Sequence, residues 1–492
     1  MSSLTFYGGI GEVGGNKILL EDGGKRLWLD FGMSFTQASK YFAEFLQPKK
    51  YNGVLDFLEM DLLPRLSDMG GFYRQDYLAH SGIETWDQAA YDAVFLSHAH
   101  ADHSFYIHFL RKEIPIFASE VTRQILTAVE NTSTSGLTDF LTYKETFKLR
   151  PKKTGGQMRV KGEEAKTARD FRVIEERAVI GEVAIEALPV NHSIPGALGF
   201  IIHTSAGAVV YTGDLRFHGY GGELSTRFVE RAAEIKPIAL ICEGTRIEEA
   251  ESHTEQEVQD VAGKLVRDTR NLVIVNYPWK DIERMRSFYE VAKSSGRRLA
   301  VSLKQAHLLK LLEGTDAQAP SLDDEHIAIY IDRKNWGLIT KPHYPRDIVE
   351  QDYEAWEREF LDHPNAVTCE DIHRHQSEFI VRIDFFDLAD LIDIRPAEGS
   401  CYIRSVTEPH DDEDFIELQR VENWLEHFEL YPYQQIHASG HASGPELKKL
   451  IAEINPKAVF PIHTEKPERF QDVVPKGIRV VVPEKGMRYR LD

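Results

Sequence analysis

The sequence predicts an α/β protein in which one domain is interrupted by a second α/β unit. Residues 1–247 carry mainly short apolar runs that are typical of strands, and residues 433–492 return to the same style. Residues 248–432 instead alternate strand and helix patterns, which is the arrangement of a parallel sheet. The length of 492 residues also exceeds what a single hydrophobic core usually supports.

The opening segment is expected to be β structure. Apolar runs predict strands at Leu4–Tyr7, Lys17–Leu20 and Arg26–Asp30, and Glu21–Gly24 is a turn signal. The glycines at positions 9, 11 and 14 spell GxGxxG, which is a dinucleotide-binding fingerprint only when a helix follows. Because a hairpin follows here, we expect these glycines to make tight turns and close backbone approaches.

Each of the next predicted strands ends near a residue whose side chain can bind metal or take part in catalysis. They are predicted at Ala93–Ser97, Val183–Val190, Phe200–Thr204, Ala208–Thr212 and Ile238–Cys242. The pattern then changes, because Thr254 and Glu257 form a capping box ahead of apolar residues at helical spacing. A helix is therefore predicted from Thr254 to Arg267.

A strand, a helix and a strand are then predicted at Leu272–Asn276, Ile282–Ser294 and Arg298–Ser302, which is the unit of a parallel sheet. Later strands are predicted at Ile327–Ile331, Phe379–Ile383, Ser400–Arg404, Ala458–Ile462, Ile478–Val482 and Met487–Arg490, with a helix at Val421–Glu429.

Composition predicts a globular protein of the cytoplasm. The chain is 42% hydrophobic and 28% charged, and no apolar run approaches the roughly 18 residues that a membrane span needs. The N-terminus lacks the pattern of a secretory signal. Cys242, Cys369 and Cys401 lie far apart in the sequence, which indicates reduced thiols.

The formal net charge of −20 argues against a general positive surface for nucleic acid, since affinity for a polyphosphate comes largely from Lys and Arg. A local groove stays compatible with this charge, because bound dications add positive charge. Basic stretches also occur at Lys144–Lys166 and Arg297–Arg298. The alternative is that these stretches are solvated loops.

The segment HAHADHS predicts a metal site. His98, His100, Asp102 and His103 follow the apolar run Ala93–Leu96, and alternation at a strand end points His98 and His100 to one side. A turn can bring Asp102 and His103 to a second position, so two adjacent cation sites are expected. These ligand types suit zinc better than manganese or iron. A solvated polar loop is the alternative.

Three further ligand candidates lie at predicted strand ends. His192 precedes Pro195-Gly196, Asp214 follows an apolar strand where a carboxylate can bridge two cations, and His463 follows another strand. Each of them alone is more often a structural residue. Their recurrence at strand ends favours the metal site.

Residues 437–446 predict an anion site at the start of a helix. Ser443 and Glu446 form a capping box, and apolar residues then recur at helical spacing. Free N–H groups at a helix start attract anions, so a phosphate is the expected ligand. The residues proposed to bind it are His437, Ser439, Gly440, His441 and Ser443. The alternative is that Ser443 only caps the helix.

Together these residues resemble the metallo-β-lactamase fold and, within it, the β-CASP nucleases, with the greatest similarity to ribonuclease J. HAHADH fits the HxHxDH motif of the family. Family order is also kept by His192, Asp214, Glu243 in CEGTR, His441 in ASGHAS and His463 in PIHTE. GGIGEVGGN, NLVIVNYPWKDIERM and GSCYIRS are similar to segments of ribonuclease J.

The resemblance implies an αββα sandwich with an inserted β-CASP domain between Glu243 and His441. It also implies two Zn²⁺ ions, with Mn²⁺ as an alternative metal. His98, His100 and His192 would hold one ion, Asp102, His103 and His463 the other, and Asp214 would bridge them. Glu243 would orient His441, and these two residues together with Asp102 are the expected catalytic residues.

A histidine at the position of His463 goes with RNA processing in this family, so RNA is the expected partner and no membrane is expected. Only 29 residues follow His463, so the C-terminal domain of ribonuclease J is expected to be missing. Segments 33–90 and 140–170 have no clear counterpart. Exonuclease or endonuclease action and a homodimer are left open.

Metal-dependent hydrolysis of RNA phosphodiester bonds is the resulting hypothesis. Two cations lower the pKa of a shared water, and His441 would stabilise the phosphoryl charge or protonate the leaving oxygen. Tyr277, Trp279 or Tyr402 would stack on bases. The alternatives are a hydrolase of thioesters or lactones with the same fold, and an RNA-binding scaffold without activity.

Overall fold

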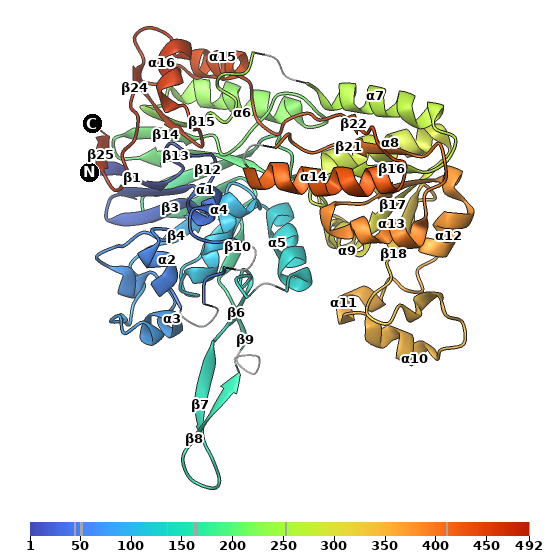
Figure 1. Ribbon diagram of the computed structural model, residues 1–492. Helices are drawn as coiled ribbons and strands as arrows, with labels where there is room; N and C mark the ends of the chain where they lie inside the picture. Colours follow the sequence, from blue (N-terminus) through green and yellow to red (C-terminus); the bar gives the residue numbers. More distant parts are fainter. Residues whose placement is uncertain are drawn as a thin grey trace.

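The computed structural model describes residues 1–43, 46–49, 53–134, 136–161, 166–250, 253–409 and 412–491. In this part of the chain, three seven-stranded sheets form the framework (Figure 1). No helix among these residues is long and apolar enough to cross a membrane.

The first two sheets pack face to face. The first has the order β10-β5-β4-β3-β2-β1-β25 and the second the order β11-β12-β13-β14-β15-β23-β24. Their inner faces share one hydrophobic core, in which the ring of Phe6 stacks on Phe460 at 5.5 Å and Phe95 meets Phe200 at 5.9 Å. The strands of the first sheet are β1 (Ser2–Gly8), β2 (Lys17–Asp22), β3 (Lys25–Phe31), β4 (Ala93–Phe95), β5 (Ile116–Ala118), β10 (Phe171–Val173) and β25 (Arg488–Leu491). Those of the second are β11 (Arg177–Ile180), β12 (Val183–Pro189), β13 (Leu198–Thr204), β14 (Gly207–Tyr211), β15 (Ala239–Glu243), β23 (Ala458–Ile462) and β24 (Arg479–Val480).

Helices cover the outer faces of this sandwich. The second sheet packs against α6 (Gly222–Ile235) and α15 (Gly444–Ile454) through a separate apolar cluster. The outer face of the first sheet is covered by α1 (Phe35–Ser39), α2 (Leu55–Glu59), α3 (Gln75–His80), α4 (Ala101–Ser104), the 3-10 helix η2 (Phe105–Phe109) and α5 (Glu120–Thr132). The layers are therefore αββα, as the resemblance implied.

The third sheet has the order β19-β18-β17-β20-β16-β21-β22, and all its strands run parallel. Its strands are β16 (Val273–Asn276), β17 (Arg298–Ser302), β18 (Ile327–Ile331), β19 (Ala366–Thr368), β20 (Phe379–Arg382), β21 (Cys401–Arg404) and β22 (Gln434–Gln435). One face carries α7 (Glu255–Asp268), α8 (Ile282–Ser295) and α9 (Leu303–Leu312), and the other α12 (Cys369–Arg374), α13 (Leu391–Ile394) and α14 (Asp412–His427). Two short helices, α10 (Arg346–Val349) and α11 (Ala355–Arg358), project beside it (Figure 1).

The chain leaves the second sheet after β15 and re-enters it at β23, which is the parallel neighbour of β15. The third sheet is formed by the chain between these two strands. Its last strand, β22, lies just beyond the proposed boundary at residue 432. The two halves touch where α5 packs against α9, with Asn131 Nδ2 3.2 Å from His307 Nε2.

Some elements differ from the sequence-based expectations. The predicted helix at Val421–Glu429 is longer, because α14 already begins at Asp412, and the predicted strand Ile478–Val482 shrinks to two residues. Segment 33–90 forms three short helices against the first sheet, and segment 140–170 forms a protruding hairpin. This hairpin is built from β6 (Thr142–Lys144), β7 (Phe147–Pro151), β8 (Gln157–Lys161) and β9 (Lys166–Ala168).

Parallel pairing places the predicted ligands at one edge of the sandwich. The strands β14, β15 and β23 run parallel, so their carboxyl ends lie side by side. Asp214 follows β14, Glu243 ends β15 and His463 follows β23. On the other sheet, β3 and β4 are also parallel, and His98 follows β4.

Candidate metal centre and its surroundings

Three histidines form the first cluster of ligand atoms. His98 Nε2 and His192 Nε2 each lie 3.0 Å from His100 Nδ1. Three buried ring nitrogens this close together are expected where imidazoles bind a cation. Hydrogen bonds among the three rings are a less suitable explanation. The structure therefore brings together the three residues that were expected to share one ion.

The second cluster contains Asp102, His103 and His463. His463 Nε2 lies 3.1 Å from Asp102 Oδ2, and His103 Nε2 lies 3.7 Å from the same oxygen. The ligand atoms of these three residues all lie within 4.8 Å of one another. They adjoin the first cluster, because His103 follows His98 in the same loop with ring centroids 4.1 Å apart.

Asp214 lies between the two clusters. Its Oδ2 is 3.0 Å from His103 Nε2, 3.4 Å from His463 Nε2, 3.7 Å from His98 Nε2 and 3.8 Å from His192 Nε2. A carboxylate that reaches ligand atoms of both clusters has the place of a bridging ligand.

The donor atoms fit zinc. Asp214 Oδ1 is buried and has no hydrogen-bond partner among the described residues, which is costly unless another ligand satisfies it. Imidazole nitrogen and carboxylate oxygen are zinc ligands, and Cys242, the buried thiol of β15, is not in either cluster. The seven side chains thus offer two adjacent places for a dication.

For His98, His100, His192 and Asp214, electrostatics favour the protonation state that binds metal. Burial lowers the pKa of His98 and His192 well below its ordinary value and that of His100 to about 3, so these rings are neutral. Burial raises the pKa of Asp214, but nearby His103 and His463 outweigh it and hold that pKa well below the ordinary value. Asp214 is therefore ionised. Burial lowers the pKa of His103 too, but Asp214 outweighs it and raises that pKa, so a metal ion would displace a proton there.

In three of the ligand histidines, the ring nitrogen Nδ1 contacts a neighbouring protein oxygen. His192 Nδ1 donates to the carbonyl of Gly440 at 2.6 Å, His103 Nδ1 lies 2.7 Å from Asp30 Oδ2, and His463 Nδ1 lies 2.8 Å from Thr245 Oγ1. Such contacts fix the tautomer and direct Nε2 toward the metal. Asp30 and Thr245 were not found from the sequence.

The backbone around the centre is tightly fitted. A Cβ on Gly14 would lie 2.5 Å from Asp102 Oδ2, and one on Gly32 would lie 1.7 Å from the Asp102 carbonyl oxygen. The GxGxxG segment therefore permits a close backbone approach, as expected, and β2 rather than a helix follows it. Asp30 and His463 have φ values of 55° and 53°, in a region that non-glycine residues rarely adopt.

His441 lies beside the metal centre and is paired with Glu243. Its Nδ1 is 3.1 Å from Glu243 Oε2 and 4.0 Å from Asp214 Oδ2. Glu243 is itself fixed, because Oε1 accepts the backbone N–H of Leu215 at 3.1 Å. Burial lowers the pKa of His441, but Glu243 outweighs it and raises that pKa to about 9.

The loop 437–441 rests on two buried arginines. Arg284 donates to the carbonyl of Ala438 at 2.8 Å, and Arg216 donates to the carbonyl of Ser439 at 3.1 Å. Both side chains are fully buried, and both pair with Glu255. No sequence pattern indicates this network, because its members come from α7, α8 and the loop after β14.

The predicted phosphate-binding residues divide into two groups. Ser443 donates to Glu446 Oε2 at 2.8 Å and is 3% exposed, so helix capping alone accounts for it. The half-buried His437 has no partner for Nε2 among the described residues, and Ser439 Oγ accepts the N–H of His441 at 3.2 Å. Only His437, Ser439, Gly440 and His441 therefore stay candidates for a phosphate.

One lysine near the centre was missed. Lys280 follows β16 and lies near the metal cluster. Burial lowers the pKa of Lys280 to about 8, and the nearby carboxylate of Asp102 partly opposes this shift. Its Nζ is 5.6 Å from the ring centroid of Phe105. A single Lys between an aromatic residue and an acid gives no pattern that sequence reasoning can recognise.

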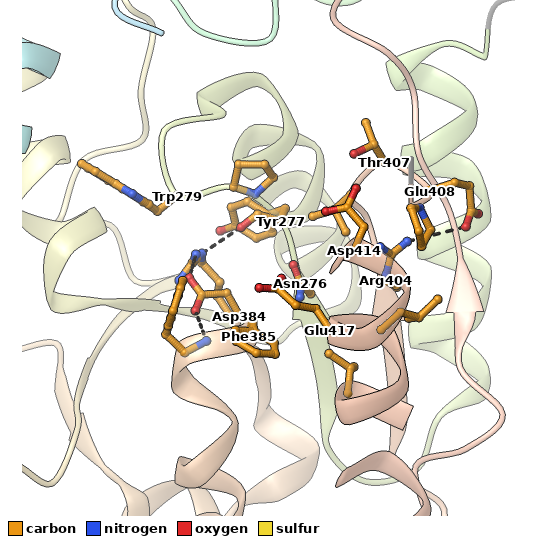
Figure 2. Close-up of a pocket in the computed structure, with 17 residues that line it drawn as sticks. Asn276, Tyr277, Trp279, Asp384, Phe385, Arg404, Thr407, Glu408, Asp414 and Glu417 are labelled. Carbon is orange, nitrogen blue, oxygen red and sulfur yellow. Dashed lines mark hydrogen bonds and ion pairs between the residues drawn. The ribbon is translucent and has the colours of Figure 1, made fainter. Parts of the chain in front are cut away.

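Two of the three residues proposed to stack on bases are buried and cannot contact RNA. Tyr277 is 0% exposed and stacks on Phe288 at 5.4 Å, and Tyr402 is 1% exposed. Trp279 is half-buried and lines a pocket of 280 Å³ at the carboxyl ends of β16, β20 and β21, facing α14 (Figure 2). The arginines of this pocket are already paired, Arg382 with Asp384 and Arg404 with Glu408 (Figure 2). Phosphate is therefore not the ligand that its lining favours.

Comparison with known proteins places these observations in a family. Residues 68–269 match the model of the beta-lactamase superfamily domain, and residues 433–483 match that of the Zn-dependent metallo-hydrolase RNA specificity domain. These two matches identify both parts of the chain as domains of the metallo-β-lactamase superfamily. Several curated proteins that the chain resembles are named ribonuclease J.

Three relatives named ribonuclease J illustrate the similarity. The protein of Sinorhizobium meliloti is 30% identical over 128 residues, which are 25% of this chain and 23% of that one. The Mycolicibacterium smegmatis protein is 25% identical over 306 residues, or 60% and 44% of the two chains. Ribonuclease J 2 of Streptococcus pyogenes is 24% identical over 480 residues, or 94% and 69%. The chain thus covers less than two thirds of the length of the first two.

A crystal structure of a protein of unknown function from Enterococcus faecalis has the same fold. It superposes with a TM-score of 0.71 and 23% sequence identity, covering 99% of both chains.

Proposed function

We propose that this protein is a zinc-dependent ribonuclease that hydrolyses RNA phosphodiester bonds, with two Zn²⁺ ions in the clusters described above and with Mn²⁺ as an alternative. The observation that carries the proposal is the set of seven ligands bridged by Asp214, directly beside the His441–Glu243 pair. The match of residues 433–483 to an RNA specificity domain supports RNA as the substrate.

When bound, the two cations supply an activated water and positive charge for the oxygens of the scissile phosphate. The protein's own residues position the substrate. Ser439 and Gly440 lie in a loop fixed by Arg216 and Arg284, so this loop presents a rigid surface to a phosphate. Lys280 approaches from the inserted unit and adds a positive charge near Asp102.

His441 is proposed as the residue that assists the leaving group. Its Nδ1 is occupied by Glu243, which keeps the proton on that nitrogen and orients the ring. Because the pKa of His441 is raised to about 9, the ring also carries a proton on Nε2 near neutral pH, so Nε2 can donate a hydrogen bond to the phosphoryl group or a proton to the departing oxygen. Replacement of His441 would therefore affect the chemical step more than metal binding.

The direct test uses end-labelled single-stranded RNA. Substrates with 5′-hydroxyl, monophosphate or triphosphate ends, digested over time with zinc or manganese, show whether mononucleotides or internal fragments appear. Release of products that depends on added metal supports the proposal, and the product pattern assigns exonuclease or endonuclease action. Cleavage of thioester or lactone substrates without any cleavage of RNA would refute it.

A further inference from the structure

Residues 142–161 and 166–168 form an arm that projects from the sandwich. At its root β6 pairs antiparallel with β9, and farther out β7 pairs antiparallel with β8. Figure 1 shows β7 and β8 extending well beyond the helices that surround the first sheet. Residues 149–159 are exposed throughout, including the apolar side chains of Leu149 and Met158 at 61% and 46%.

The arm has the opposite charge to the rest of the chain. Residues 142–168 contain eight Lys and Arg against three Glu, a net charge of +5 in a chain of −20. The basic residues are Lys144, Lys148, Arg150, Lys152, Lys153, Arg159, Lys161 and Lys166. A polyanion that the acidic body repels would be attracted to this arm.

A buried ionic network holds the outgoing side of the arm's root. Arg74, whose side chain is 0% exposed, pairs with Asp76 at 2.9 Å and with Asp139 at 2.7 Å. It also donates to the carbonyl of Lys144 at 2.6 Å. Asp76 in turn accepts from the backbone N–H of Thr146 at 3.0 Å and from its hydroxyl at 2.7 Å.

The returning side is held by Arg169. This fully buried guanidinium donates to the carbonyls of His108, Leu110 and Asp139, each at 2.9 Å. A two-stranded hairpin is marginally stable alone, and buried charges are costly unless paired. The network therefore fixes the direction of a ribbon that has few contacts of its own.

The root also adjoins the metal-binding half at a defined place. His108 belongs to η2, the 3-10 helix that follows the helix carrying His103, and its Nδ1 accepts the N–H of Asp139 at 3.1 Å. Glu130, near the end of α5, accepts the N–H groups of residues 140–142. Because α5 packs on α9, the arm starts at the junction of the two halves.

We propose that this arm is a second RNA-binding site, which holds the phosphate backbone of single-stranded RNA away from the metal centre. The inference rests on the proposed function, which supplies RNA as the substrate. Arg and Lys on an exposed ribbon bind phosphates without reading bases, so the interaction is independent of sequence and sensitive to salt.

The test compares two variants with equal loss of charge. The arm variant is R150S/K152S/K153S/R159S, and the control is K264S/R267S/R270S/K293S, whose exposed side chains lie on or next to α7 and α8, away from the arm (Figure 1). Binding of a long single-stranded RNA to chelator-treated protein is measured by fluorescence anisotropy at several salt concentrations. Cleavage of a tetranucleotide by the metal-loaded variants is measured in parallel.

The arm variant is expected to lose at least about tenfold in affinity for the long RNA. Its slope of log K against log salt should also become shallower by about 2 to 3, at roughly 0.7 for each lost contact with a single strand. The control variant and cleavage of the tetranucleotide should be nearly unchanged. Equal losses in both variants, or no loss in the arm variant, would overturn the proposal.

Two further outcomes separate this proposal from the proposed function. If no RNA is cleaved by any form but the arm variant still weakens RNA binding, the ribonuclease assignment fails and the arm stands. If light scattering shows that the arm variant changes the oligomeric state while RNA affinity is kept, the arm contacts another subunit and the RNA site is refuted.

Discussion

At the scale of single residues, the side chains behind the ligands were the least predictable part of the centre. Asp30 ends its strand far from HAHADHS in the sequence, and yet its carboxylate holds His103 and also accepts from Tyr211. An isolated aspartate at a strand end carries no motif. The ligands themselves could be predicted, because His98, His100, Asp102 and His103 fall within one short segment.

Asp30→Asn is expected to lower zinc affinity about 10- to 100-fold, since it weakens the acceptor that fixes the ring of His103. Competition with a chromophoric chelator measures this affinity. Asp22→Asn is a matched control, because Asp22 is also buried but accepts from Ser2 and Ser205 instead. Equal losses in the two variants would mean that Asp30 acts on folding rather than on the metal.

His441→Ala is expected to keep the metal content and to lower the rate of RNA cleavage by about 10²- to 10⁴-fold. The reason is that His441 lies beside the clusters and is oriented by Glu243. Elemental analysis and single-turnover rates are the two measurements. Full turnover in this variant would remove His441 from the mechanism, and loss of metal would make it a ligand.

At the scale of elements, loop 437–441 shows why a site can be predicted while its geometry cannot. The capping box at Ser443 and Glu446 identified the start of α15. The contact of Gly440 with His192, which comes from the loop after β12, depends on the tertiary fold alone.

Gly440→Ala is expected to lower both zinc affinity and activity. An added Cβ would lie 2.9 Å from His192 Cε1 and 2.8 Å from Ser193 Oγ, so the ring must shift. Gly263→Ala in α7 is the control, because its Cβ would meet the end of the Arg267 side chain at 3.3 Å and Val291 Cγ2 at an ordinary 3.8 Å, and alanine favours a helix by about 1 kcal/mol. Unchanged zinc affinity in Gly440→Ala would show that the close contact between Gly440 and His192 is not needed for metal binding.

The root of the arm makes stability depend on pH. Burial raises the pKa of Asp76, but Arg74 outweighs it and lowers that pKa to about 2. A carboxyl with a depressed pKa stabilises the fold above its unfolded pKa of about 4 and loses that contribution as the pH falls toward 2. The contribution at neutral pH is about 2 kcal/mol.

Asp76→Asn should therefore be about 2 kcal/mol less stable at pH 7 and equally stable near pH 2, as measured by urea unfolding across this range. Asp323→Asn is the control, since Asp323 is 86% exposed. If the free energy of unfolding of Asp76→Asn were lower than that of the parent protein by the same amount from pH 7 to pH 2, the carboxylate charge would not be the cause of the difference.

At the scale of the whole molecule, the class of fold followed from the sequence because strand runs at both ends enclose a region of alternating strands and helices. The short helices of segment 33–90 could not be predicted, since each has only five or six residues and is held by tertiary contacts. The arm was seen in the sequence only as a basic stretch. The direction in which the arm projects depends on Arg74 and Arg169, and both residues lie outside the arm.

One apolar cluster runs from the first sheet through α5 and α9 into the third sheet, so the two halves should unfold together. Calorimetry is expected to show a single transition, which moves to lower temperature when a chelator removes the metal, because a ligand that binds only the folded state stabilises it. Two separate transitions, or no shift on chelation, would contradict this prediction.

All seven metal ligands, together with Glu243 and His441, lie on chain outside residues 248–432. The stretch between β15 and β23 leaves and rejoins the sandwich at adjacent strands. The metal-binding side chains and the inserted stretch are therefore separate parts of the polypeptide. An exchange of this stretch between two relatives would keep all seven proposed ligands but would replace Lys280 and the Arg284–Glu255 pair that supports loop 437–441.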